Sequence, residues 1–160
     1  MRFIGYLLLF AVIAYGIYPY YYVYRIDDAM GKDGTEELKP LVDLEAIRAN
    51  YKKRVDASLG GAFDPSGANP MVDWLRQNLG RLGDSALDQA ITLDWVRDSL
   101  RDATRQATNQ SPPYLLAGIT FAFFESYDTF LVRIGELGMG ATHFRMTFKG
   151  KEWRITDIIR

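Results

Sequence analysis

The sequence predicts an α+β protein with an N-terminal transmembrane helix, followed by helices packed on one face of a C-terminal antiparallel sheet of three or four strands. Three observations predict this fold. The first residues are apolar and uncharged, the middle of the chain has apolar residues at helical spacing, and the last part alternates apolar and polar residues. We therefore expect an anchor over residues 1–25 and one domain over 26–160, helical at 26–110 and forming the sheet at 115–160.

The leading segment, Phe3–Tyr24, contains no charged residue in its 22 positions. A helix of that length is roughly 33 Å long, which is enough to cross the hydrocarbon core of a bilayer, about 30 Å thick. Arg2 precedes the segment and Arg25 ends it. The sequence therefore predicts a single membrane span, with the bilayer as a binding partner.

Tyrosines crowd the far end of this segment. Tyrosine has an apolar ring and a polar hydroxyl and favours the headgroup layer, so we expect the outer interface at Tyr15, Tyr18, Tyr20, Tyr21, Tyr22 and Tyr24. Pro19 is expected to kink the helix or to separate it from a new one. Small residues allow a neighbouring membrane helix to approach closely, and the candidates are Gly5, Ala11, Ala14 and Gly16.

The positive flank before the segment predicts that Met1 lies in the cytoplasm and that the domain lies on the periplasmic side of a bacterial inner membrane. A cleaved signal peptide is the alternative. Phe3–Ala14 has the length of its apolar region, and Ala14 and Gly16 supply small residues at the spacing of a cleavage site.

Composition excludes several classes of function for the domain. Without Arg2, the chain carries 18 basic and 20 acidic residues, whereas a nucleic-acid binder has a basic excess. Cysteine is absent from the sequence, which excludes disulfides, a thiolate nucleophile and a zinc–thiolate site.

The helical part contains two clear amphipathic segments. Gly31–Gly34 predicts a turn, and Thr35 then begins a short piece that Pro40 interrupts. Asp43 is expected to cap a helix that ends at Gly60-Gly61. Its buried stripe is Leu44, Ile47, Tyr51, Val55 and Leu59.

A loop at Phe63–Pro70, a short helix at Met71–Leu79 and a break at Gly83–Ser85 are expected next. Thr92 then caps a last helix over Leu93–Ala107. The buried stripe of that helix is Val96, Leu100, Ala103 and Ala107, and its opposite face carries pairs of opposite charge.

Alternating residues predict four strands after residue 113: Ile119–Glu125, Thr129–Ile134, Thr142–Lys149 and Lys151–Ile159. A two-residue turn at Gly150-Lys151 would pair Phe148 with Trp153 and Met146 with Ile155. Because a slip by one residue would place Phe148 against Arg154, this register is well specified.

No catalytic, cofactor or metal motif is present in the sequence, so we expect a protein that is not an enzyme. His143 is the only histidine, and strand alternation places it beside Arg145, which would lower its pKa. The aromatic residues give a sharper hypothesis, an apolar pocket for a lipid or other apolar ligand, with a filled core as its alternative. The residues of that pocket are Phe121, Phe123, Phe130, Phe144, Phe148 and Trp153.

Several short motifs resemble domain-of-unknown-function family 2939, a bacterial family. The resemblance consists of an apolar leader, a Pro-Tyr pair, a tyrosine-bearing helix, a Val-Asp-x-x-x-x-Arg element and a tryptophan-containing hairpin. The matching residues are Pro19-Tyr20, Tyr24, Ala29, Leu38–Asp43, Ile47, Arg48, Ala90–Leu100 and Gly150–Arg160. Members commonly end in Leu-Pro, whereas this chain ends in Ile159-Arg160, and its middle is shorter. The resemblance implies a small exported or membrane-tethered α+β domain and assigns no activity or catalytic residue.

These observations favour a non-catalytic, single-span protein whose domain serves as an accessory or assembly subunit of a complex of integral membrane proteins. The alternative is an exported binding module, of cystatin-like or nuclear-transport-factor-like shape, that holds an apolar ligand. A cavity lined by the aromatic residues would support that alternative, and a solid core would argue against it.

Overall fold

The computed structural model describes residues 2–60 and 84–160. The predicted loop at Phe63–Pro70 and the predicted helix at Met71–Leu79 lie outside the described residues.

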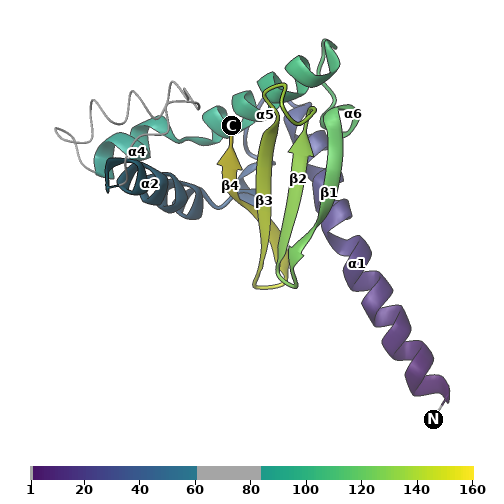
Figure 1. Cartoon of the computed structure of the whole chain (residues 1–160). Helices are drawn as coiled ribbons and strands as arrows, with labels where there is room; N and C mark the ends of the chain where they lie inside the picture. The colour runs from purple at the N-terminus through teal and green to yellow at the C-terminus, as the bar shows by residue number, and fades with distance from the viewer. Residues whose placement is uncertain (1, 61–83) are drawn as a thin grey trace.

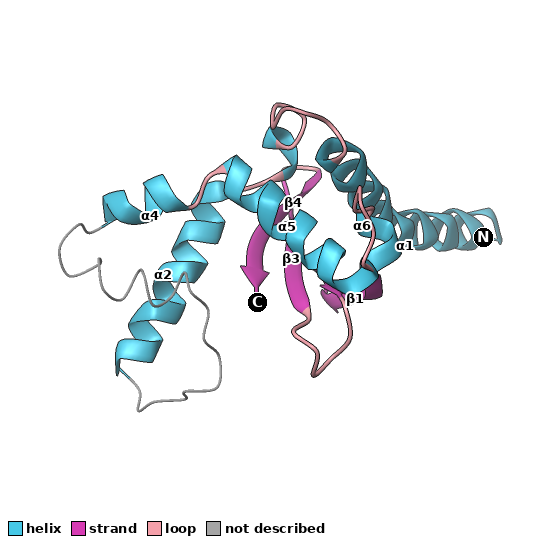
Figure 2. Cartoon of the chain, turned by 90° about the horizontal axis from the view of Figure 1, so that it is seen from above, coloured by secondary structure: helices cyan, strands magenta, loops and turns pink. Residues whose placement is uncertain are grey.

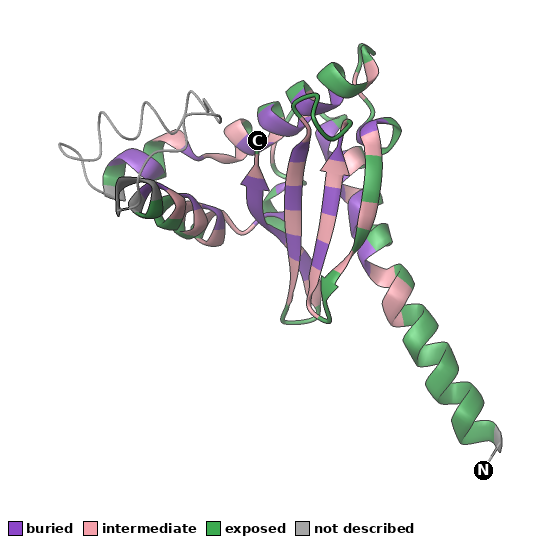
Figure 3. Ribbon diagram, in the orientation of Figure 1, coloured by how far each residue is buried: buried purple, intermediate pink, exposed green. Residues whose placement is uncertain are grey.

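Helix α1 (Arg2–Met30) runs without a break from its exposed first half into the domain (Figure 1). Pro19 lies inside this helix, so of the two alternatives expected there, a kink or a new helix, the second is wrong. Figure 3 shows the first half fully exposed, whereas the last turns combine buried residues with intermediate and exposed ones. The side chain of Phe3 is 88% exposed, whereas that of Ile26 is 0% exposed. One helix therefore forms both the apolar leader and part of the domain core.

Four antiparallel strands form one sheet in the order β1-β2-β3-β4, with bounds β1 (Ile119–Ser126), β2 (Thr129–Ile134), β3 (Thr142–Lys149) and β4 (Glu152–Ile159). The predicted hairpin is confirmed, since Phe148 pairs with Trp153 and Met146 with Ile155. A β-bulge follows between Arg145 and Met146.

The two capped helices were predicted correctly. In α2 (Leu44–Gly60), the backbone N–H of Ala46 donates to Asp43 Oδ1 at 3.0 Å. In α5 (Leu93–Thr108), the N–H of Trp95 donates to Thr92 Oγ1 at 3.2 Å. Ala107 is exposed, so its predicted place in the buried stripe is wrong.

Three short elements were not predicted: the 3₁₀ helix η1 (Lys39–Leu41), α4 (Asp84–Ala90) and α6 (Leu115–Gly118). None is long enough to show a helical period in the sequence. Each connects larger elements, and α4 begins inside the segment that was expected to be a break.

One hydrophobic core joins the last turns of α1 and the helices α2 and α5 to the sheet. Along β2, the alternate residues Phe130, Val132 and Ile134 are buried and face this core. Seen from above, α5 crosses the end of the sheet, while α2 and α4 lie to one side (Figure 2). The α+β architecture with an apolar N-terminal helix is therefore as the sequence predicts.

Candidate functional site

The exposed half of α1 is the most unusual surface of the molecule. Every residue from Phe3 to Ala14 is exposed, and no charge interrupts them. Among the described residues, one helix is long and apolar enough to cross a membrane, and a signal sequence would satisfy the same criteria. The first contacts between α1 and the rest of the domain are made by Tyr15, the residue after this exposed stretch. The candidate site is therefore the end of the domain from which the apolar half of α1 extends.

Three tyrosine hydroxyls bind the domain to the helix at this end. Tyr15 donates to the carbonyl oxygen of Tyr127, in the turn between β1 and β2. Tyr18 donates to the carbonyl oxygen of Lys151, in the β3–β4 turn, at 2.9 Å. Both hairpin turns therefore lie beside the helix, and Figure 1 shows them at the end of the sheet nearest the leading segment.

The third hydrogen bond lies further along the helix, where Tyr20 donates to the carbonyl oxygen of Ala122 at 2.9 Å. The ring of Tyr15 also contacts the rings of Phe124, Phe148 and Trp153, with centroid distances of 5.9 to 6.2 Å. These contacts fix the direction in which α1 leaves the domain.

The predicted tyrosine interface is divided by the fold. Tyr22 is only 4% exposed and lies in the domain core, so its assignment to the membrane interface is wrong. Tyr15 and Tyr18 are half-buried against the sheet, while Tyr20, Tyr21 and Tyr24 stay exposed. Tyr22 belongs to the core cluster, so the last turns of α1 pack as part of the domain core.

The small residues of the leading segment make no close contact within the chain. A Cβ atom built on Gly5 or Gly16 would meet nothing within 4 Å, and Ala11 and Ala14 are exposed. These four residues are accessible to another helix, and their role in helix packing remains a prediction.

The aromatic residues of the sheet do not enclose a common pocket. Phe130, Phe144 and Trp153 are fully buried, and Phe148 packs on Trp153 with a centroid distance of 5.4 Å. Phe121 and Phe123 are 43% and 59% exposed. They pair with Arg133 and Leu131 on the outer face, because Ala122 and Phe124 take the inner positions opposite Val132 and Phe130. The prediction that Phe121 and Phe123 face the same space as the buried rings is therefore wrong.

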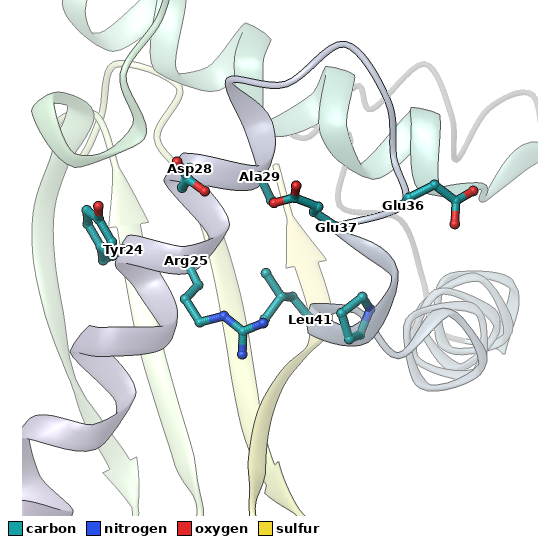
Figure 4. Close-up of a pocket in the computed structure, with 8 residues that line it drawn as sticks. Tyr24, Arg25, Asp28, Ala29, Glu36, Glu37 and Leu41 are labelled. Carbon is teal, nitrogen blue, oxygen red and sulfur yellow. The ribbon is translucent and has the colours of Figure 1, made fainter.

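A cavity of about 380 Å³ lies where the end of α1 meets η1 (Figure 4). Its walls combine one guanidinium with three carboxylates, from Arg25, Asp28, Glu36 and Glu37, beside Leu41. Two of those carboxylates are occupied by Lys32, whose Nζ lies 3.1 Å from Asp28 and 2.5 Å from Glu37. Within residues 2–60 and 84–160, no group of three metal-ligating side chains is found.

A chain of charged side chains crosses the outer face of the sheet. Arg54 of α2 donates to both carboxylate oxygens of Asp157, at 2.7 and 2.8 Å. Arg145 contacts the same carboxylate at 3.4 Å and donates to Glu125 at 2.5 and 3.0 Å. The hydrogen bond from Arg145 holds the pKa of Glu125 below its usual value. These contacts link α2 to the edge strand β1.

His143 lies on the same face, between Arg133 and Arg145. Partial burial lowers the pKa of His143 most, and the two neighbouring cations lower it further. The predicted direction is confirmed, although burial is the larger cause. The charged imidazolium is disfavoured here, so His143 is a neutral member of the sheet surface at pH 7.

The depressed pKa of His143 predicts a pH dependence of stability. As pH falls through about 6.5, the unfolded chain binds a proton that the folded chain does not yet bind, so the free energy of unfolding decreases. We expect urea unfolding of the full chain in detergent micelles to show a lower midpoint at pH 5.5 than at pH 8. The His143→Gln variant should show a flatter profile over that range, and an equal slope in both proteins would refute the assignment.

The Val-Asp-x-x-x-x-Arg element has a structural explanation. Val42 forms a parallel bridge with Ile155, and the N–H of Asp43 donates to the carbonyl oxygen of Ile155 at 2.8 Å. The carboxylate of Asp43 also accepts from Lys149 at 2.8 Å. Burial alone would raise the pKa of Asp43, but the hydrogen bonds from Lys149 and Ala46 outweigh it and lower that pKa.

Arg48 completes this element. Its guanidinium donates to the carbonyl oxygen of Ile91 at 2.9 Å and pairs with Asp88 at 3.1 Å. The motif therefore joins α2 to the sheet on one side and to α4 on the other.

Comparison with known protein families gives one finding. A family model described as a protein of unknown function, DUF2939, matches residues 8–98. The match includes the Val-Asp-x-x-x-x-Arg element and confirms the family that the sequence motifs indicated, whereas the tryptophan hairpin lies outside the matched residues. No curated protein and no solved structure matches the chain.

Proposed function

The chain belongs to the DUF2939 family of proteins of unknown function, and we propose that it is a single-span membrane protein whose domain serves as a non-catalytic accessory or assembly subunit of a membrane protein complex. The observation that carries this proposal is the continuity of α1 from its exposed apolar half into the domain core. A helix without a flexible linker fixes the height and rotation of the domain relative to the span. A subunit that presents one face to neighbours in the membrane needs this fixed placement.

The contacts at Tyr15 favour an anchor over a cleaved leader. Cleavage after Gly16 would remove the Tyr15 ring from Phe124 and Trp153, together with its hydrogen bond to the β1–β2 turn. In our proposal the leader is retained, Arg2 stays in the cytoplasm and the domain lies on the periplasmic side of a bacterial inner membrane.

The polar side chains of the fold support a non-catalytic role. Asp43 caps a helix, Asp157 binds two arginines, and Asp27 accepts the backbone N–H of Leu115 at 2.6 Å. These acids hold elements together, and their hydrogen-bonding capacity is used within the chain. The ligand-binding alternative has less support, because the aromatic residues expected to line its pocket are packed on one another or lie on the outer face.

Gly5 tests the proposed subunit role most directly. In Gly5→Leu, a bulky side chain would prevent close approach of a neighbouring membrane helix, and we expect at least a tenfold weaker complex, equivalent to about 1.4 kcal/mol. Folding of the domain should be unchanged, because nothing lies within 4 Å of the added Cβ. The measurement is native sizing and mass spectrometry of the tagged protein extracted from its own membranes in mild detergent.

Ile4→Leu is the matched control, since Ile4 is equally exposed and apolar but not small. It should leave the complex intact. A wild-type protein that migrates alone in mild detergent, without membrane subunits, would refute the accessory-subunit role.

A further inference from the structure

The part of α1 that is free of the domain is short for a membrane span. The 12 residues of Phe3–Ala14 are exposed on all sides, and they measure about 18 Å along the helix axis. The hydrocarbon core of a bilayer is about 30 Å thick. From Tyr15 onward, the helix is hydrogen-bonded to the hairpin turns. The free helix therefore falls about 12 Å short of spanning the core if the domain stays clear of the bilayer.

The edge strand β1 and its hairpin turn carry exposed aromatic residues beside the part of α1 that follows the free helix. Tyr127, at the point of the β1–β2 hairpin, is 81% exposed, and Phe123 on the outer face of β1 is 59% exposed. They are four positions apart, which is about 13 Å along an extended chain. The hydrogen bond from Tyr15 places Tyr127 next to Tyr15 on the helix. The hydrogen bond from Tyr20 places Ala122, the neighbour of Phe123, next to Tyr20.

Helix α1 also carries exposed apolar side chains between Tyr15 and Tyr21. Ile17, Tyr20 and Tyr21 are 61%, 43% and 54% exposed. The apolar surface of the leader therefore continues past Tyr15 along the exposed side of α1. A continuous apolar surface of this kind marks contact with a membrane or a protein.

Charged residues limit how deep this end of the domain can lie. Asp128, Lys151 and Glu152 are in or next to the two turns, and moving a charged side chain into the hydrocarbon core is costly. The headgroup layer accepts both charges and tyrosine rings. Sinking the two turns into the headgroup layer shortens the mismatch, and local thinning of the bilayer, whose cost grows with each Å, makes up what remains.

We propose that the tip of the β1–β2 hairpin is a second membrane contact: Tyr127 inserts into the headgroup layer of the bilayer that α1 crosses. The occupant of this surface is lipid, and the contact is made by an aromatic ring and not by a basic patch. It does not require anionic lipid. The inference rests on the anchoring part of the proposed function and is independent of any partner subunit. It places the turn end of the sheet at the membrane surface.

The absence of cysteine in the sequence allows a clean test by single-site spin labelling of the full chain. Tyr127→Cys carries a nitroxide label, and the protein is placed in nanodiscs of pure phosphatidylcholine. Met139→Cys is the matched control, because Met139 is 85% exposed and lies in the loop at the opposite end of the sheet. Leu8→Cys reports on the span itself, since Leu8 is 60% exposed on the leading half of α1.

Collisions with oxygen and with a water-soluble nickel complex measure the depth of each label. We expect the label at 127 to be at least about threefold less accessible to nickel than the label at 139, and the label at 8 to be shielded further.

Equal nickel accessibility at 127 and 139, with 8 shielded, would overturn the hairpin contact and leave the anchor intact. Nickel accessibility at all three positions would overturn the anchor and the contact together. Shielding of 127 that appears in native membranes but not in pure lipid would overturn lipid as the occupant and indicate a protein.

Discussion

Replacing Trp153 by alanine is expected to lower the free energy of unfolding by about 3–5 kcal/mol, the usual cost of removing a buried large aromatic side chain. Trp153 is fully buried, and its ring contacts Phe124, Phe130 and Phe148 as well as Tyr15 of α1. Its loss would leave a cavity between the helix and the sheet. Thermal or urea unfolding of the full chain in detergent micelles measures the effect.

Two variants make this prediction specific. Phe123→Ala removes a ring that is 59% exposed, and its expected cost is below about 0.5 kcal/mol. Trp153→Phe should cost much less than Trp153→Ala, because the indole Nε1–H of Trp153 is buried without a hydrogen-bond partner and phenylalanine does not bury that polar group. If Phe123→Ala and Trp153→Ala destabilised the protein equally, the two faces of the sheet would have been assigned the wrong way round.

Arg54→Ala is expected to have the second largest effect, a loss of about 2–4 kcal/mol, because removal of one partner leaves a buried carboxylate without its main counter-charge. Asp157 is 5% exposed and receives two hydrogen bonds from Arg54, which also donates to the carbonyl oxygen of Ile158 at 3.2 Å. The guanidinium lies over the ring of Tyr51 at 4.4 Å. Arg145 remains as a weaker partner of Asp157 at 3.4 Å, which limits the loss.

A double-mutant cycle isolates the ionic part of this effect. Arg54→Ala should cost less in an Asp157→Asn background, since the charge that needs compensation is then absent. Lys53→Ala, at the exposed neighbouring position, is the matched control and should change stability by less than about 0.5 kcal/mol. Equal costs of Arg54→Ala in both backgrounds would show that Arg54 contributes packing alone.

Local features of the fold were predictable because their causes are local. Asp43 and Thr92 cap their helices through hydrogen bonds that span three residues. The β3–β4 register follows from a two-residue turn and from the need to keep Phe148 and Met146 on the face of Trp153 and Ile155. In each case the competing arrangement exposes an apolar residue or loses a cap, so the sequence pattern leaves one solution.

Predictions failed where both choices satisfied the local pattern. β1 has apolar residues on both faces, Phe121 and Phe123 on one and Ala122 and Phe124 on the other, so alternation cannot say which pair is buried. Pairing with β2 decides it, since Val132 and Phe130 face the core. Likewise, the sequence of α1 is apolar along most of its length, so hydropathy alone cannot locate the residue at which α1 begins to contact the domain.

The sequence by itself determined the elements of this protein: the uncharged helix, the capped amphipathic helices and the hairpin register, because these depend on neighbours a few residues apart. The tertiary structure decided that α1 passes through Pro19 into the core, that Tyr22 is buried, and that the hairpin turns meet the helix at Tyr15 and Tyr18. Those contacts join residues more than 100 positions apart. These contacts form only when the sheet packs on the helix. The spacing of residues along the sequence does not predict that packing.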